Sequence, residues 1–149
     1  MALRRKRWRY ESEVEYVFRC WGCPNIRAKH GKTIEFTRDD EIGIRADCVI
    51  GIRADFELGE LKKFKGKILI SVECGGVVDE FHAIVNPNFS DDREVVLRKS
   101  RYSSARTFGV MLNKGADGLK RDIAKLMRNP EQEMIVRIFQ KPVRKIVAE

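Results

Sequence analysis

Glutamine is scarce in this chain of 149 residues. It occurs twice, as Gln132 and Gln140, against 30 lysines and arginines and 22 aspartates and glutamates. Few amides among many charges is a composition typical of thermophilic proteins. No apolar run reaches the roughly 20 residues of a membrane span, and the N-terminus lacks the apolar segment of a signal peptide. We therefore expect a soluble, cytoplasmic, thermophilic protein with a single core.

The patterns that usually indicate catalysis are missing as well. Gly75-Gly76 lacks the lysine and the helix of a phosphate-binding loop, and the acidic residues are scattered over turns. Cys48 and His30 resemble a nucleophile and its base, but Cys48 begins an apolar segment and no third side chain is placed to orient the pair. The sequence therefore favours a non-enzymatic role without a cofactor.

The spacing of Cys20 and Cys23 is that of two zinc ligands. A second pair of this kind is missing, so a zinc site would have to take scattered ligands such as Cys48, Cys74 or His30. A disulfide is a further alternative in a hyperthermophile. Buried free thiols are the interpretation we favour, and we predict no metal.

Charge is divided unevenly along the chain. The net charge of +8 combines +5 over residues 1–10, −5 over residues 11–97 and +8 over residues 98–149. An acidic middle between two basic parts points to a polyanionic partner. The alternative is the charge-rich surface of a thermophilic protein.

Residues 1–10 form a basic arm that we expect to be flexible. Its cations alternate with aromatic rings, a mixture suited to phosphates and to stacked bases. The predicted nucleic-acid contacts in the arm are Arg4, Arg5, Lys6, Arg7, Trp8 and Arg9. A membrane surface would attract the same cations.

Residues 11–140 are predicted to form one domain, followed by a basic tail over residues 141–149. Alternating or apolar segments predict strands at 11–20, 32–37, 48–52, 68–74, 77–85, 94–98, 106–112 and 134–139. The order strand, turn, strand, helix, strand occurs twice, with Gly109 in the place of Gly51, so we predict two pseudo-symmetric halves, 11–85 and 86–140. Asp55 and Asn113 are the predicted helix caps. The fold class is mostly β, a sandwich or barrel with two short outer helices.

The second half carries a second set of candidate phosphate contacts. We expect one basic surface built from a turn between two strands and from the exposed face of the following helix. Its predicted contacts are Arg98, Lys99, Arg101, Arg106, Lys120, Arg121 and Lys125, with Arg128 beside them.

Three short motifs carry a resemblance to a known family. They are Gly22-x-Pro24-Asn25-Ile26-x-Ala28-x-His30, then Asp47-Cys48-Val49-Ile50-Gly51, then Gly75-Gly76. Over residues 11–140 the chain resembles the archaeal family named domain of unknown function 371. In that family a histidine usually stands where this chain has Cys23, and a glycine where it has Ala46. The resemblance implies a polar pocket at Asn25, Arg27, His30, Arg45 and Asp47.

Together these patterns predict a protein that binds RNA, structured or ribosomal, through its arm and its basic second half. Ribosomal proteins are possible further partners, and no membrane is involved. A protein or enzyme with a small ligand near His30 and Asp47 is the alternative.

Overall fold

The computed structural model describes residues 15–140 of the chain. Eight strands account for most of the regular structure, and the helices are short, as the sequence predicts. The strands are β1 (Glu15–Trp21), β2 (Thr33–Thr37), β3 (Val49–Gly51), β4 (Lys67–Cys74), β5 (Val77–Val85), β6 (Glu94–Arg98), β7 (Thr107–Val110) and β8 (Glu133–Gln140). The helices are α2 (Leu58–Leu61), the 3-10 turn η2 (Ala116–Gly118) and α3 (Arg121–Leu126). The mostly β fold class is therefore confirmed.

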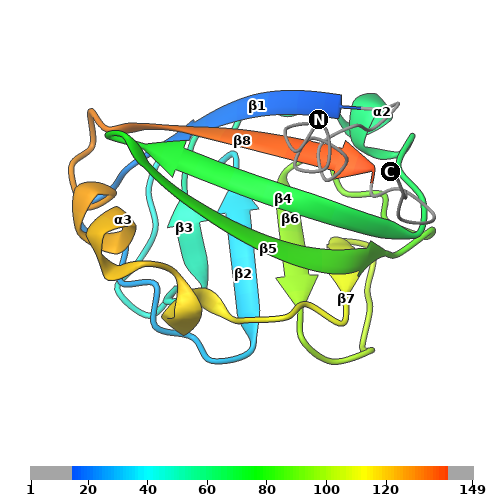
Figure 1. The fold of residues 1–149 in the computed structure, drawn as a ribbon. Helices are drawn as coiled ribbons and strands as arrows, with labels where there is room; N and C mark the ends of the chain where they lie inside the picture. The colour runs from blue at the N-terminus through cyan, green and yellow to red at the C-terminus, as the bar shows by residue number, and fades with distance from the viewer. Residues whose placement is uncertain (1–14, 141–149) are drawn as a thin grey trace, which may run out of the picture.

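The eight strands form one curled sheet in the order β1-β8-β4-β5-β7-β6-β2-β3. Long antiparallel strands run across the front of the molecule, and β2, β3 and β6 cross behind them (Figure 1). The edge strands come together at one antiparallel bridge, where Trp21 and Ile52 exchange two backbone hydrogen bonds of 2.8 Å each. Over the described residues the sheet is curled back on itself without closing into a barrel.

Two parallel strand pairs with matching registers flank the antiparallel pairing of β2 with β6. Phe36 lies opposite Gly51 in the pair β2–β3, and Leu97 lies opposite Gly109 in the pair β6–β7. Each pair contains one register shift just before these positions. Duplication of the whole half, with its helix and closing strand, stays a prediction.

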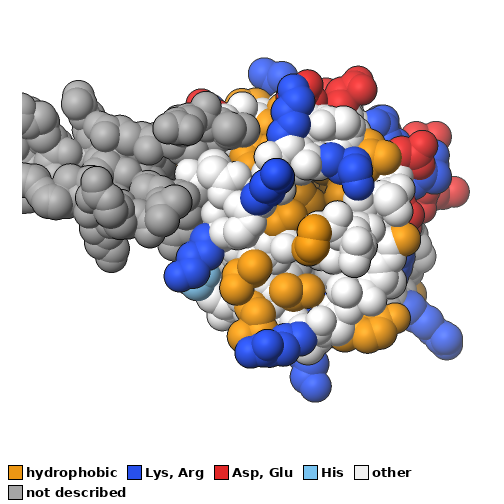
Figure 2. Space-filling model, turned by 90° about the vertical axis from the view of Figure 1, so that its right-hand side faces the viewer, with side chains coloured by type: hydrophobic (Ala, Val, Ile, Leu, Met, Phe, Trp, Pro, Cys, Tyr) orange, Lys and Arg blue, Asp and Glu red, His pale blue; other side chains and the backbone are white. Residues whose placement is uncertain are grey.

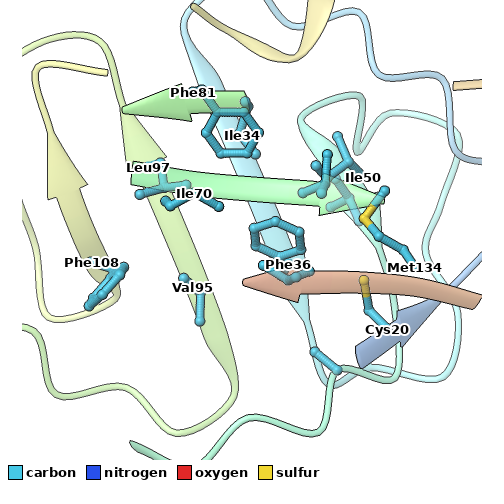
Figure 3. Packing of buried hydrophobic residues seen from close by; sticks show 14 of the residues in the cluster. Cys20, Ile34, Phe36, Ile50, Ile70, Phe81, Val95, Leu97, Phe108 and Met134 are labelled. Atoms are coloured by element: carbon cyan, nitrogen blue, oxygen red, sulfur yellow. The ribbon is translucent and has the colours of Figure 1, made fainter. Parts of the chain in front are cut away.

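The core lies between the long front strands and the crossing strands behind them. Ile34 and Phe36 of β2 point towards Ile70 of β4 and Met134 of β8 (Figure 3). Phenylalanine rings meet edge to face, with centroids 5.4 Å apart for Phe18 and Phe36. Burying a ring of this size stabilises a fold by about 1.5–3 kcal/mol, so the aromatic residues are central to the stability of the domain.

Both predicted helix caps are wrong. The Asp55 carboxylate accepts a hydrogen bond from the Arg19 backbone N–H at 2.7 Å, and α2 begins without a side-chain cap. The Asn113 side chain likewise accepts from the His82 backbone N–H at 2.8 Å. In both cases the side-chain oxygen accepts a hydrogen bond from the backbone N–H of a strand that is distant in sequence, and not from the first turn of the following helix. The two α-helices begin after these positions, at Leu58 and Arg121.

Candidate anion-binding pocket

A surface pocket of about 390 Å³ lies between the segment that follows β1 and the helix α3. The segment passes beside α3 at the left of Figure 1. Five cationic side chains line the pocket, and none of the described lining residues is acidic. The lining residues are Pro24, Asn25, Ile26, Arg27, Lys29, Ile44, Arg121, Ala124, Lys125 and Arg128.

Backbone hydrogen bonds fasten the segment to the α3 region on both sides of the pocket. The Cys23 N–H donates to the Met127 carbonyl at 2.8 Å, and the Asp117 N–H donates to the His30 carbonyl at 3.1 Å. Gly115 allows this approach, because a Cβ on it would lie 2.4 Å from the Gly31 carbonyl oxygen. The walls of the pocket are therefore held in place before any ligand arrives.

Arg121 ties the two walls together. Its Nη2 donates to the carbonyl oxygens of Ala28, at 3.0 Å, and Ala116, at 2.9 Å, and its Nε donates to that of Leu119 at 3.0 Å. Ala28 has a φ of 52°, a left-handed conformation that is uncommon for alanine. The guanidinium holds that peptide in position while it contributes positive charge to the pocket.

The other four cations of the pocket form no ion pair among the described residues. Within the described part of the chain, no carboxylate forms an ion pair with Arg27, Lys29, Lys125 or Arg128. Elsewhere on the surface cations do form ion pairs, as Arg137 does with Glu73 at 2.8 Å. Like charges gathered without acids raise the local potential and attract anions.

The deeper lining is apolar. Ile26 is 1% exposed and Ala124 is 7% exposed, so both form the floor of the pocket. Ile44 is 57% exposed and stands at its rim. The Asn25 amide holds the adjoining loop by donating to the Ile42 carbonyl at 2.8 Å. The site thus combines cationic walls with an apolar floor and rim.

The structure brings together part of the predicted polar pocket and part of the predicted basic surface. Asn25 and Arg27 line the pocket, whereas His30, Arg45 and Asp47 are not among the residues that line it. The His30 Nδ1 accepts from the Lys32 N–H at 3.1 Å. Asp47 contributes its backbone carbonyl, which accepts from the Lys29 and His30 N–H groups at 2.9 and 3.1 Å. Of the five predicted pocket residues, Asn25 and Arg27 therefore share the pocket with the cations of α3.

Lys29 and Ile44 are pocket residues that the sequence did not single out. The signal for Lys29 was its position two residues after Arg27 in an irregular segment, where both side chains can face one side. Ile44 carried a weaker signal, an isoleucine in a polar turn. Arg128 was recognised as part of the helix face.

The second-half cations fall into two groups that lie apart. The connection between β6 and β7 lies at the right of Figure 1, whereas α3 lies at the left. Of the α3 group, Arg121 and Lys125 reach the pocket, and Lys120 donates to the Val78 carbonyl at 2.7 Å. The single continuous surface that we expected is therefore divided between two ends of the molecule.

The β6–β7 group has partners of its own. Arg106 pairs with Glu94. Arg98 donates to Thr107 Oγ1 at 3.1 Å and lies 5.0 Å from the centre of the exposed Tyr102 ring. Lys99 and Arg101 are exposed. Figure 2 shows this side of the molecule, where cations surround scattered apolar side chains and the acids gather along one margin. The predicted arm contacts, residues 4–9, lie outside the described residues.

The cysteines are free thiols. Cys20, Cys23 and Cys74 are buried and Cys48 is half-buried. Among residues 15–140 there is no group of three or more His, Cys, Asp or Glu side chains arranged to hold a metal ion. Cys48 donates to the Glu35 carboxyl at 3.4 Å, and burial next to this acid raises its pKa to about 12. Among residues 15–140, His30 Nδ1 bonds to Lys32 and the Cys48 thiol bonds to Glu35, so no hydrogen bond joins His30 to Cys48 as a base and its nucleophile.

Comparison with known protein families identifies the family of this chain. The family described as Domain of unknown function (DUF371) matches residues 18–141. The chain belongs to this family. A relative from Methanocaldococcus jannaschii, described as "Uncharacterized protein MJ0206", is 31% identical over 137 residues, which cover 85% of this chain and 99% of the relative. The family match confirms the resemblance that the sequence motifs indicated, and the relative comes from an archaeon. In the described part of this DUF371 chain, no helix has the length and apolar character to cross a membrane.

Proposed function

We propose that the protein binds RNA without catalysing a reaction, and that the pocket beside α3 holds one of the phosphate groups. The observation that supports this most is the set of five cations that line the pocket with no acid among the described lining residues. Phosphate contacts of this kind supply most of the sequence-independent affinity for nucleic acid.

The division of the cations gives the proposal a geometry. The β6–β7 connection, with Lys99, Arg101 and the exposed Tyr102, lies away from α3. A folded RNA is large enough to contact both ends at once, whereas a short strand would contact one. We therefore propose structured RNA, such as ribosomal RNA, as the partner, with ribosomal proteins beside it and the cytoplasm as the location.

Binding to a structured RNA measured over a range of salt concentrations tests the proposal. The triple variant Arg27→Gln, Lys125→Gln, Arg128→Gln removes three uncompensated cations from the pocket. Each phosphate contact that is lost should lower the slope of log affinity against log salt by about 0.7–0.9, so we expect a decrease of about 2–3 and at least tenfold weaker binding.

The matched control is Lys63→Gln, Lys65→Gln, Lys67→Gln, which makes the same change in net charge outside the pocket lining. The control should bind with close to the original affinity. Equal losses in the two triple variants would mean that net charge alone is at work and would overturn the role of the pocket. If the unaltered protein does not bind RNA, the proposed function is wrong.

Sedimentation of cell extracts tests the partner. We expect the full chain to migrate with ribosomal subunits at low salt and to be released by nuclease. We also propose that the basic arm, residues 1–10, contacts the RNA, so deletion of these residues should release the protein as well. Migration that is unchanged after nuclease treatment would instead indicate a protein partner.

A further inference from the structure

We infer that the pocket beside α3 selects a nucleotide that carries a terminal phosphate, either at the end of an RNA strand or as a free nucleotide. This rests on the proposed function in that it assigns a ligand to the same pocket. It goes further, because it distinguishes a chain end from the internal phosphates that any RNA offers.

The first argument is charge. Arg27, Lys29, Lys125 and Arg128 have no ion pair within the described residues, and Arg121 adds a fifth positive charge. An internal phosphodiester carries one negative charge, whereas a terminal phosphate carries about 1.5 to 2 at neutral pH. Extended phosphate chains carry more. A site with this many uncompensated cations is better neutralised by a terminal phosphate than by an internal one.

The second argument is shape. The pocket has a floor, because Ile26 and Ala124 at its base are buried. Its volume of about 390 Å³ lies near the lower end of the range for small-molecule pockets, about 300–1,000 Å³. An internal nucleotide needs an entrance and an exit for its two neighbours. A terminal nucleotide needs an opening for only one neighbour, and a pocket of this volume has space for it.

The third argument is the apolar rim. Ile44 is 57% exposed, Pro24 is exposed as well, and both line the pocket. A phosphate alone would leave these side chains in water. A nucleotide can cover them with the face of its base while its phosphate reaches the cations. The Oδ1 of Asn25 accepts no hydrogen bond from the described residues, so it is available to a donor on the ligand.

The wall geometry supports selection as well as binding. Arg121 fixes the Ala28 peptide on one wall and belongs to α3 on the other, so the two backbone segments from which the cations project are held together. A preformed site loses little conformational freedom on binding and discriminates between ligands of different charge.

The test compares RNA strands of one sequence that differ at their ends. Fluorescence anisotropy competition is measured with a 5′-phosphate strand, a 3′-phosphate strand and a strand with two hydroxyl ends. The free-nucleotide arm uses ADP, with inorganic phosphate beside it. We expect one of the phosphorylated strands, or ADP, to bind at least tenfold more tightly than the hydroxyl strand, and inorganic phosphate to compete weakly.

Two variants link the preference to the pocket. Arg27→Gln with Arg128→Gln should abolish the preference for the terminal phosphate. Ile44→Ser should weaken the binding of ADP by about fivefold and leave the binding of inorganic phosphate unchanged. The control Lys63→Gln with Lys65→Gln should keep the preference. Thermal unfolding of each variant verifies that the fold is intact.

The outcomes separate the inference from the function on which it rests. If RNA binds with equal affinity whatever its ends, and ADP does not bind, the inference is wrong while RNA binding stands. If ADP binds and no RNA does, the pocket takes a terminal phosphate and the proposed RNA function is wrong. If neither RNA nor ADP binds, both are wrong.

Discussion

The guanidinium Nη2 of Arg121 lies 3.0 Å from the carbonyl oxygen of Ala28 and donates a hydrogen bond to it. The two residues belong to segments far apart in sequence, and this contact spans the space between the walls of the pocket. It connects the fold to the site, because the same group stabilises the wall and supplies charge. A substitution that keeps the charge but loses the fork of donors separates these roles.

Arg121→Lys should therefore destabilise the protein. A lysine cannot reach three carbonyl groups in the arginine geometry, so we expect a loss of about 1–3 kcal/mol in the free energy of unfolding, measured by urea denaturation. RNA affinity should fall as well although the net charge is unchanged. Lys125→Gln is the control, and it should unfold like the unaltered protein. A variant Arg121→Lys that equals the unaltered protein in both measurements would contradict the positioning role.

Glu35 should make stability depend on pH around neutrality. It is 6% exposed on β2, and burial together with the neighbouring charge of Glu94 raises its pKa to about 7, although Arg106 and the hydrogen bond from Cys48 act in the opposite direction. A carboxyl group whose pKa is higher in the folded state stabilises the fold below its unfolded value, here 4.5. That contribution is lost as the pH rises through about 7.

Replacing Glu35 by glutamine should remove this pH dependence. Between pH 5 and pH 8 we expect the unaltered protein to lose about 2 kcal/mol relative to Glu35→Gln, in urea denaturation at each pH. Glu73→Gln, on a more exposed carboxylate, is the control and should follow the unaltered protein. Parallel curves for Glu35→Gln and the unaltered protein would show that Glu35 is ionised throughout.

Asp79 should behave in the opposite way. It is 7% exposed, and it accepts hydrogen bonds from the Lys114 ammonium at 2.7 Å and the Lys120 N–H at 2.9 Å. Burial opposes ionisation of this carboxyl group, but these bonds and one from the Glu80 N–H outweigh burial and lower its pKa below the usual 3.8. Its contribution is therefore present above pH 3.8 and is lost as the pH falls through the lower folded value.

Asp79→Asn should cost about 1–2 kcal/mol at pH 7, and the difference from the unaltered protein should shrink towards pH 3. The residue joins β5 to the start of α3, so the amide N–H groups of α3 should exchange faster in the variant. Hydrogen exchange at pH 7 measures this directly. Asp122→Asn is the control, because the Asp122 carboxylate forms no hydrogen bond or ion pair among residues 15–140. Unchanged exchange in α3 would refute the anchoring role of Asp79.

Gly51 should tolerate no side chain. A Cβ at this position would lie 2.2 Å from the Cys20 sulfur, at the point where the two edges of the sheet approach each other. We expect Gly51→Ala to cost about 3 kcal/mol or more, seen as a lower melting temperature. Gly59→Ala in α2, where nothing lies within 4 Å, is the matched control and should be neutral or stabilising by up to about 1 kcal/mol. Partial rescue by Cys20→Ala would confirm the cause.

The strands were accessible to sequence analysis because their signal is local. The segments predicted at 77–85 and 94–98 coincide with β5 and β6. Apolar side chains alternate along β5, and β6 is a short apolar run, and both patterns indicate a strand without knowledge of its neighbours. The helix caps failed for the converse reason. Asp55 and Asn113 had the right chemistry at the right spacing, but each found a strand N–H that only the tertiary fold brings near.

The pocket depended on the same kind of distant contact. Arg27 and Arg121 were both singled out, but in two different hypotheses, since nothing in the sequence places the segment after β1 against α3. The backbone bond between Cys23 and Met127 makes that connection. His30 and Asp47 were expected beside Asn25 because the family resemblance implied a common pocket, yet His30 and Asp47 meet through their backbone groups.

The bridge between Trp21 and Ile52 has a consequence for how copies of this protein meet in a crowded solution. An exposed strand edge is a template on which another chain can add a strand, the first step towards aggregates. Here the two outermost strands of the sheet occupy each other at the bridge, and Arg19 and Asp55 extend the contact with two more hydrogen bonds of 2.7 and 3.1 Å. Because these backbone groups of the edge strands are paired within one chain, they are closed to a second copy. This pairing favours a protein that remains dispersed while its cations stay available to a partner.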